Sequence, residues 1–383
     1  MSITVEEAKD TVKQWYRRLY ETKDPFSVPA VVLVSAPGAG KSMSVRQACQ
    51  ELSNELGIAI ELRDIRLSQY DPTDIKGLPR FVDNNVEWTI PTIWPRSGYG
   101  ILFFDEINLA PPAVQAACYR IILDRSLENW ELPEGWMIVA AMNPPEQAQI
   151  AFPIPPPLRN RMVFLDIRVD WKTWFDWAIK RGIHPDIISF LAPEYRRESY
   201  LLKFSLDKPF PSPRSWEFVH KILKMHLSEP ELKEAIIGAV GPEVALEFFA
   251  WRRLGRTVGD IPRRIIFGEK VDIKPILEGE ETVEGHKFRR LDLLYFILTA
   301  ALESIGRIKE MSVEEAATNY AEYLLYLYER GEKEPETFPR EITVTFGAKL
   351  LELFPDYIPG ELLDVISDWV ISGEITGTEI RER

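Results

Sequence analysis

The loop at residues 35–42 has the clearest chemical pattern in the chain, because it carries two glycines followed by Lys41 and Ser42. The apolar, β-branched run Ala30–Val34 before it predicts a buried strand, and residues 44–52 after it have the spacing of a helix. Such a loop directs backbone N–H groups toward an anion at the positive end of the helix. Lys41 would reach the β- and γ-phosphates, and the Ser42 hydroxyl would bind Mg²⁺. The sequence therefore predicts a nucleoside triphosphate site.

One position of the loop departs from the general phosphate-loop pattern, which has glycine where this chain has Ser35. Serine can end a strand without a positive φ, so the departure is compatible with the loop. The alternative is a surface turn that contains Gly-Lys-Ser by chance. The residues predicted to contact the nucleotide are Pro37, Gly38, Ala39, Gly40, Lys41, Ser42, Met43, Asn143 and Arg214.

Two adjacent acids, Asp105 and Glu106, follow a second buried run, residues 101–104. Parallel strands end at the sheet edge where the phosphate loop also lies. We expect Asp105 to hold Mg²⁺ directly or through water, and Glu106 to orient and deprotonate the attacking water. The alternative is a strand end whose acids cap the next helix.

Asn143 ends a further predicted strand, residues 136–141, just before two prolines. Its amide is placed to contact the γ-phosphate or the attacking water. The alternative is an asparagine tolerated in the turn before proline.

Three arginines are candidates for contacts with phosphate. Arg159 and Arg161 lie just before a predicted strand, residues 162–167, and Arg214 begins a predicted helix. A guanidinium supplied to a neighbouring copy's γ-phosphate accelerates hydrolysis by roughly three to five orders of magnitude. Arg214 could bridge a helical domain to the nucleotide. The alternative for all three is a solvated or salt-bridged surface position.

Composition restricts the class of protein. The 383 residues include 59 acidic and 46 basic side chains, a net charge of −13, which disfavours non-specific nucleic-acid binding. No apolar run is long enough for a membrane helix, and the first residues lack the features of a signal peptide. The four histidines form no metal-ligand pattern, and the two cysteines are expected to be reduced thiols. We therefore predict a cytoplasmic protein without a membrane partner.

The order of patterns predicts an α/β fold. Five buried runs, alternating with helical segments, indicate a parallel sheet over residues 1–168, together with an N-terminal helix over 4–21. Residues 80–89 are predicted to form a hairpin. After residue 170 the spacing is almost wholly helical, and we expect a helical lid over 169–255 and a mostly helical extension over 256–383. The helices are expected near residues 171–182, 184–191, 214–227, 230–238, 242–253, 290–305, 313–330 and 359–371.

Taken together, these motifs resemble those of the MoxR-type AAA+ ATPases. The matching stretches are Ala36–Ser42, Arg66–Pro79, Leu102–Asn108, Pro157–Arg161 and Ser212–Glu217. The resemblance covers about residues 5–255 and implies an AAA+ P-loop core of five parallel strands, in which the Asn143 strand lies between the phosphate-loop strand and the Asp105 strand.

The resemblance also implies roles for particular residues. Asn143 would be sensor 1, Arg161 the finger acting in trans, and Arg214 sensor 2; the motif Arg159-Asn160-Arg161 leaves open which arginine acts. The hairpin at 80–89 looks like the helix-2 insert, and a hairpin around the turn 132–135 looks like the pre-sensor-1 hairpin. Family members form six-membered rings and act as chaperone-like machines, often with a von Willebrand factor A-type partner.

The predicted function is ATP hydrolysis by a Mg²⁺-dependent ring oligomer that remodels or activates partner proteins. ATP rather than GTP is implied by the resemblance alone, and the client is not predicted. One alternative is a nucleotide-gated assembly scaffold with little turnover. Another is a nucleic-acid motor or loader, which is disfavoured by the acidic balance and by the hairpin tip, Asp83-Asn84-Asn85, because the tip carries no positive charge for phosphates.

Overall fold

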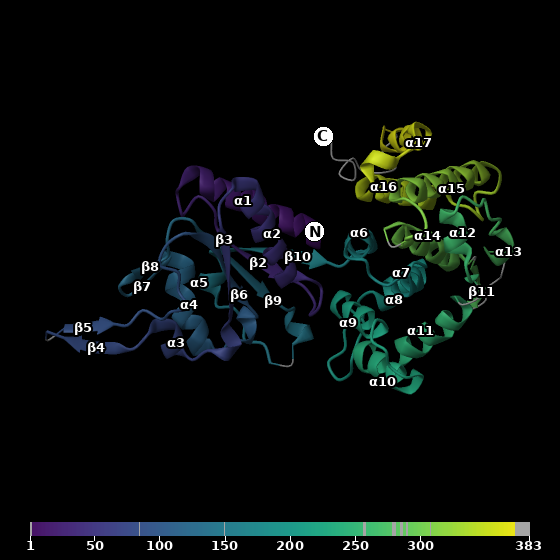
Figure 1. Cartoon of the computed structure of the whole chain (residues 1–383). Helices are drawn as coiled ribbons and strands as arrows, with labels where there is room; N and C mark the ends of the chain where they lie inside the picture. Colours follow the sequence, from purple (N-terminus) through teal and green to yellow (C-terminus); the bar gives the residue numbers. More distant parts are fainter. Residues whose placement is uncertain are drawn as a thin grey trace. The chain divides into compact units, whose positions relative to one another are not determined.

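The computed structural model describes residues 2–83, 85–148, 150–255, 258–277, 281–283, 286–288, 290–306 and 308–371 (Figure 1). The chain divides into two compact units. Unit 1 comprises Met1–Trp174 and Leu202–Ser215, and unit 2 comprises Phe175–Leu201 and Trp216–Arg383. The three-part division expected from the sequence, with boundaries at residues 168 and 255, stays a prediction.

Unit 1 is built on a parallel sheet with the strand order β1-β10-β2-β9-β6-β3. Its strands are β1 (Ile3–Thr4), β2 (Ala30–Val34), β3 (Ile60–Arg66), β6 (Tyr99–Asp105), β9 (Trp136–Met142) and β10 (Met162–Arg168). The α/β fold class and the five-stranded parallel core are confirmed, and the short β1 adds a sixth strand at the edge. The strand that precedes Asn143 lies between the phosphate-loop strand and the Asp105 strand, which is the order that the resemblance implied.

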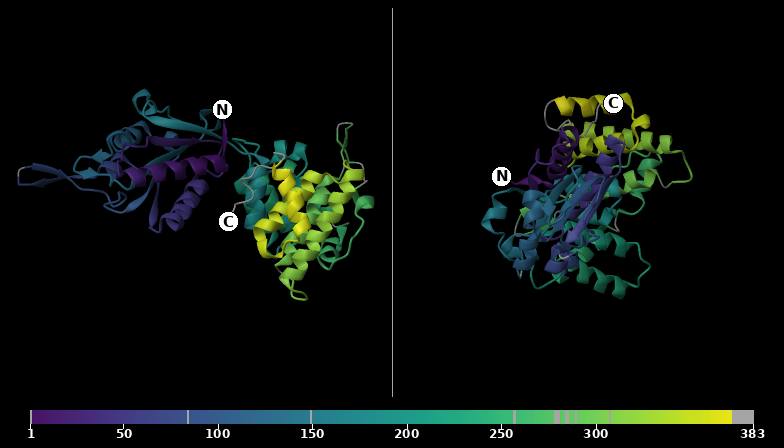
Figure 2. Two further views of the ribbon diagram at one scale, coloured as in Figure 1. Left: turned by 90° about the horizontal axis from the view of Figure 1, so that it is seen from above. Right: turned by 90° about the vertical axis from the view of Figure 1, so that its left-hand side faces the viewer.

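Two helical layers cover the sheet, as the alternation of side chains along each strand requires. Val31, Leu33 and the residues in phase with them on β6 and β9 pack against α1 (Val5–Thr22) and α2 (Lys41–Leu56). Val32 and its counterparts pack on the other side against α4 (Pro112–Asp124). Figures 1 and 2 show α1 and α2 as the purple and blue-violet helices against the sheet. Because both faces are buried, the strands read as continuous apolar runs.

The predicted hairpin at residues 80–89 is confirmed. β4 (Pro79–Val82) pairs with β5 (Asn85–Trp88) and the pair extends away from the sheet (Figure 1). Asn84, at the tip, lies outside the described residues. The short helices α3 (Pro72–Lys76) and α5 (Pro156–Arg159) complete unit 1.

The prediction of hairpin arms on either side of residues 132–135 is wrong. The small hairpin there consists of β7 (Ser126–Leu127) and β8 (Trp130–Glu131). Residues 133–136 do form a turn, with the Trp136 N–H donating to the Pro133 carbonyl at 3.0 Å. The chain after that turn is β9, which is buried along its whole length and pairs with β2 and β6, so it is unavailable as a hairpin arm.

Unit 2 is mostly helical. Its helices, two of which (α6 and α9) begin in unit 1, are α6 (Trp171–Arg181), α7 (Pro185–Leu191), α8 (Glu194–Tyr200), α9 (Pro213–Leu223), α10 (Glu229–Val240), α11 (Pro242–Gly255), α12 (Ile261–Ile266), α13 (Lys274–Leu277), α14 (Leu291–Ile305), α15 (Val313–Lys333), α16 (Arg340–Leu353) and α17 (Gly360–Ile371). One antiparallel pair, β11 (Glu281–Val283) and β12 (His286–Phe288), lies before α14. All eight predicted helices are present; α8, α12, α13 and α16 were missed. In the part of the chain that the structure describes, none of the helices combines the length and the apolar character of a membrane span.

Candidate nucleotide site

The loop between β2 and α2 has a backbone that only glycine adopts easily at two positions. Gly38 has φ +80° and Gly40, the residue that precedes α2, has φ +108°. A Cβ atom at Gly38 would lie 2.7 Å from the Ser212 hydroxyl oxygen, so that residue also has no room for a side chain. The loop leads directly into the start of α2, where backbone N–H groups are able to bind an anion.

Lys41, the first residue of α2, is buried and folded back onto its own loop. Its Nζ donates to the Ser35 carbonyl at 2.6 Å, the Ser35 hydroxyl at 3.2 Å, the Ala36 carbonyl at 3.2 Å and Asn143 Oδ1 at 3.0 Å. Burial lowers the pKa of the Lys41 amine to about 8, against the attraction of Asp105 and with the help of the positive charge of Arg214. The lysine is therefore held at the carboxyl edge of the sheet, next to the Asn143 side chain.

Ser42 and Asp105 meet directly. The Ser42 hydroxyl donates to Asp105 Oδ2 at 2.9 Å, and the Asp105 side chain is largely buried at the end of β6. A hydroxyl and a carboxylate oxygen at this spacing suit Mg²⁺, which prefers oxygen ligands and usually binds one or two carboxylates together with substrate phosphates. The described residues contain no cluster of three or more histidine, cysteine or acidic side chains able to hold a metal. The pair therefore fits a magnesium ion that arrives with phosphate.

Glu106 occupies a strained backbone position, φ +56°, which is uncommon for a residue with a side chain. Its N–H donates to Asp105 Oδ1 at 3.0 Å, and its carboxylate accepts a hydrogen bond from the Ser68 hydroxyl at 3.3 Å. Strain of this kind concentrates at functional sites, where the surrounding structure holds it. The bend separates Glu106 from the strand that ends at Asp105.

Asn143 is fixed from two sides. Its side-chain oxygen accepts from Lys41, and its carbonyl accepts a hydrogen bond from the Asn108 amide at 2.8 Å. Asn108 is fully buried, and it links the segment after Glu106 to the end of β9. No role was predicted for Asn108 from its type and position, although it lies two residues after the acids in the stretch Leu102–Asn108.

Arg214 belongs to unit 1, together with the loop that it contacts. Its N–H donates to the Gly38 carbonyl at 3.3 Å, and its positive charge acts on Lys41. No role was predicted for Ser212 either, and its hydroxyl is the group that a side chain at Gly38 would meet. Met43 lies in the first turn of α2 with 48% of its surface exposed. The segment at residues 212–214 therefore covers the loop from one side.

Arg159 and Arg161 lie at the opposite edge of the sheet. Arg161 directly precedes β10, whose first residue, Met162, pairs with Ala30 at the start of β2. The phosphate loop follows the far end of β2, about 13 Å away for four steps of a strand. Both arginines are exposed, and the Arg159 guanidinium lies 5.8 Å from the centre of the Phe164 ring. The structure brings every other predicted site residue to one edge and leaves these two at the other.

Comparison with known proteins adds little. No family model and no curated protein matches the chain. Solved structures with partial likeness include a Cytophaga hutchinsonii protein provisionally described as an ATPase, with 15% identity, 59% of this chain and 80% of that chain covered and a TM-score of 0.29. A mutant of Thermotoga maritima RuvB has 16% identity and a TM-score of 0.37, with 71% of this chain and 83% of that chain covered. Brucella abortus NtrX has 14% identity and a TM-score of 0.28, with 92% of this chain and 67% of that chain covered. These low scores leave the function to be inferred from the geometry of the chain itself.

Proposed function

We propose that the chain is a MoxR-like AAA+ protein that hydrolyses ATP as a ring oligomer, with nucleotide between protomers, and that it remodels or activates partner proteins. The observation that carries ATP hydrolysis is the connected set at the carboxyl edge: Lys41 bonded to Asn143, and Ser42 bonded to Asp105. Lys41 and Ser42 begin α2 after the loop that follows β2, Asp105 ends β6, and Asn143 follows β9; the strand order β2-β9-β6 brings these three places together.

The residues of this set have different chemical roles. Lys41 and the loop N–H groups bind the β- and γ-phosphates, and Ser42 and Asp105 hold the metal, which neutralises phosphate charge when bound. The Glu106 carboxylate accepts the proton of the attacking water, whose oxygen forms the new bond to the γ-phosphorus as the bond to the β-phosphate oxygen breaks. The Asn143 amide orients that water or the γ-phosphate.

The position of Arg161 supports assembly. Arg161 lies at the amino edge of the sheet, away from the loop of its own chain, so in this proposal it acts on the phosphate bound by a second copy. The six-membered ring, the client-remodelling role and a von Willebrand factor A-type partner rest on the resemblance of the motifs to the MoxR type.

The test compares steady-state ATPase rates of the wild type, Glu106→Gln and the control Glu131→Gln, which changes an exposed acid on β8. We expect Glu106→Gln to lose about a hundredfold to ten-thousandfold in rate, while calorimetry shows ATP binding unchanged. The control should keep the wild-type rate. Equal rates for all three proteins would remove Glu106 as the base. ATP binding without turnover in the wild type would favour the assembly scaffold instead.

A further inference from the structure

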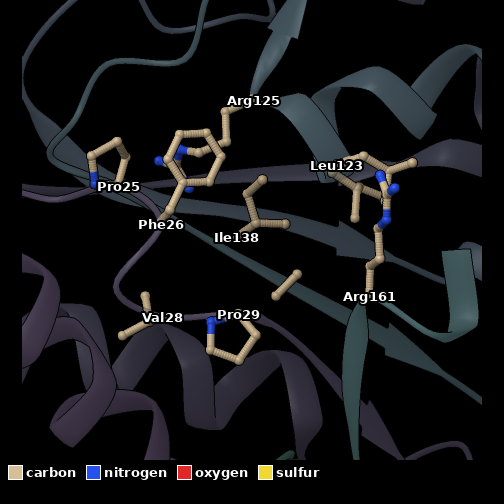
Figure 3. A pocket seen from close by; sticks show the side chains of 10 residues that line it. Pro25, Phe26, Val28, Pro29, Leu123, Arg125, Ile138 and Arg161 are labelled. Atoms are coloured by element: carbon tan, nitrogen blue, oxygen red, sulfur yellow. The ribbon is translucent and has the colours of Figure 1, made fainter.

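A small cavity lies at the amino edge of the sheet, away from the phosphate loop (Figure 3). Its volume is about 120 Å³, and its wall is formed by residues 25–26 and 28–30, the end of α4, Arg125, Ile138 of β9 and Arg161. Apart from two arginines, Arg125 and Arg161, the side chains that line it are apolar. The cavity lies entirely within unit 1.

Neither arginine has an anionic partner in the lining. Arg125 is 7% exposed and donates to the Trp136 carbonyl, but its Nε has no hydrogen-bond partner among the described residues. Burial lowers the pKa of Arg125 to about 10. The carboxylate of Asp24 acts on Arg125 from outside the lining, and one of its oxygens accepts from the Phe26 N–H at 2.9 Å.

Arg161 is exposed, and within the described residues its guanidinium has no ion pair or hydrogen bond. The described residues that line the cavity include no acid. Two guanidinium groups therefore border one apolar cavity in a chain whose net charge is −13. A buried cation is costly without a partner, and a carboxylate bonded to a guanidinium gains charge-assisted hydrogen bonds.

We propose that this cavity is a binding site for a carboxylate on a short apolar stem, with the carboxylate bonded to Arg161 at one end of the cavity and the stem directed toward Phe26 and Arg125 at the other (Figure 3). The volume sets the size of the stem, since a cavity of roughly 150 Å³ holds a benzene molecule. A carboxylate group of this kind has two sources: a free small carboxylate, or an acidic side chain of a second copy of this chain.

The site has a consequence for catalysis that rests on the proposed function. Arg161 cannot bind a carboxylate in its own cavity and at the same time stabilise phosphate charge on a neighbouring copy. Occupation of the cavity should therefore inhibit hydrolysis in the assembled protein, and leave nucleotide binding unchanged, because the phosphate loop is at the other edge of the sheet.

The binding test uses butyrate as the probe and the full-length chain without nucleotide, with binding followed by ligand-observed NMR. We expect saturable binding that Arg161→Met weakens about tenfold or more, since a charge-assisted pair is lost. Arg159→Met is the matched control: it removes the same charge two residues away, outside the cavity, and should bind butyrate like the wild type. Ala30→Leu, which fills the cavity without removing a charge, should abolish binding.

The outcomes are separable. No saturable butyrate binding by the wild type, equal binding by Arg161→Met, or competition by the neutral analogue butyramide would overturn the site. Butyrate binding that is lost as the nucleotide-free chain is concentrated identifies a neighbour's acidic side chain as the natural occupant, because no phosphate then competes for Arg161. Binding that does not depend on the concentration of the chain identifies a free carboxylate. Butyrate that binds but does not lower the wild-type ATPase rate would overturn the coupling. The binding result can be obtained even if the chain hydrolyses no ATP, so failure of the proposed function is seen independently.

Discussion

The two edges of the sheet in unit 1 differ in how complete their chemistry is. At the carboxyl edge, Lys41, Ser42, Asp105 and Asn143 are linked by hydrogen bonds of 2.9–3.0 Å within one chain. At the amino edge, Arg161 has no partner in the described residues. The side chains at the carboxyl edge are therefore held in place within one chain, whereas Arg161 at the amino edge is available to a second molecule.

This difference indicates how the work is divided in the proposed assembly. Groups that bind phosphate gain from being held in place, because preorganised donors need no rearrangement during the reaction. A cation that acts on another copy must instead stay accessible until assembly. One protomer then contains both halves of the chemistry, at a separation that prevents it from using both on the same nucleotide.

The largest expected effect comes from removing the amino-edge cation. Arg161→Ala should lower the ATPase rate of the assembled protein by about 10³- to 10⁵-fold, because the developing charge on the phosphate loses its guanidinium. ATP affinity, measured by calorimetry on unassembled protein, should not change. Arg159→Ala is the comparison variant. A larger loss for Arg159→Ala than for Arg161→Ala would reassign the finger, and full activity of both would remove the amino edge from catalysis.

The carboxyl edge should show its own pH dependence. Lys41 must be protonated to bind phosphate, and burial lowers its pKa from the ordinary 10.5 to about 8. The value of kcat/KM for ATP should therefore fall about tenfold per pH unit above that pKa. Bound phosphate raises the pKa again, so kcat should stay level to higher pH. A kcat/KM that is flat to about pH 10 would contradict a buried, depressed lysine.

The same shift has an effect on stability. Between about pH 8 and 10.5 the unfolded chain binds more protons than the folded chain at Lys41, so the free energy of unfolding should rise with pH through this window. Urea titrations of the wild type and Lys41→Met at several pH values measure this slope. In Lys41→Met the free energy of unfolding should rise less steeply with pH, because the contribution of Lys41 to the slope is absent.

A smaller effect should separate the two loop glycines. An alanine at Gly38 or Gly40 must adopt a left-handed backbone, which costs roughly 1–2 kcal/mol. A side chain at Gly38 would also meet Ser212 at 2.7 Å, whereas the nearest atom to one at Gly40 belongs to Val5, at 3.7 Å. Gly38→Ala should therefore weaken ATP binding about tenfold more than Gly40→Ala, equivalent to about 1.4 kcal/mol. Adding Ser212→Gly to Gly38→Ala should recover that excess; equal losses without recovery would exclude the contact.

The carboxyl edge could be predicted from the sequence because its signals are local. The phosphate loop directly follows one apolar run and the acid pair directly follows another, and a parallel sheet brings the ends of its strands to one edge. The contacts of Asn108 and Ser212 could not be predicted, since they depend on which loops meet in space. Ser35, which looked like a departure from the pattern, supplies two acceptors to Lys41.

Helix α16 shows where sequence patterns fail in unit 2. Its residues 342–346 are β-branched or aromatic and favour a strand by propensity. In the fold, Ile342, Val344 and Phe346 are buried, and Gly347 lies close to Leu362 and Ile366 of α17. Packing of this kind outweighs intrinsic propensity, which spans only about 1 kcal/mol per residue. The β7–β8 hairpin was misplaced for a similar reason, since the run after residue 135 pairs within the central sheet.

The most direct test of the division between the two edges is to mix two inactive proteins, Lys41→Ala and Arg161→Ala. Each alone should hydrolyse almost no ATP, because the first lacks the phosphate ligand and the second the cation. In mixed assemblies some interfaces combine an intact Lys41 with a neighbour's intact Arg161, and random mixing in equal amounts should restore about a quarter of the wild-type rate in a closed ring. A mixture no more active than the sum of its two components would contradict the account.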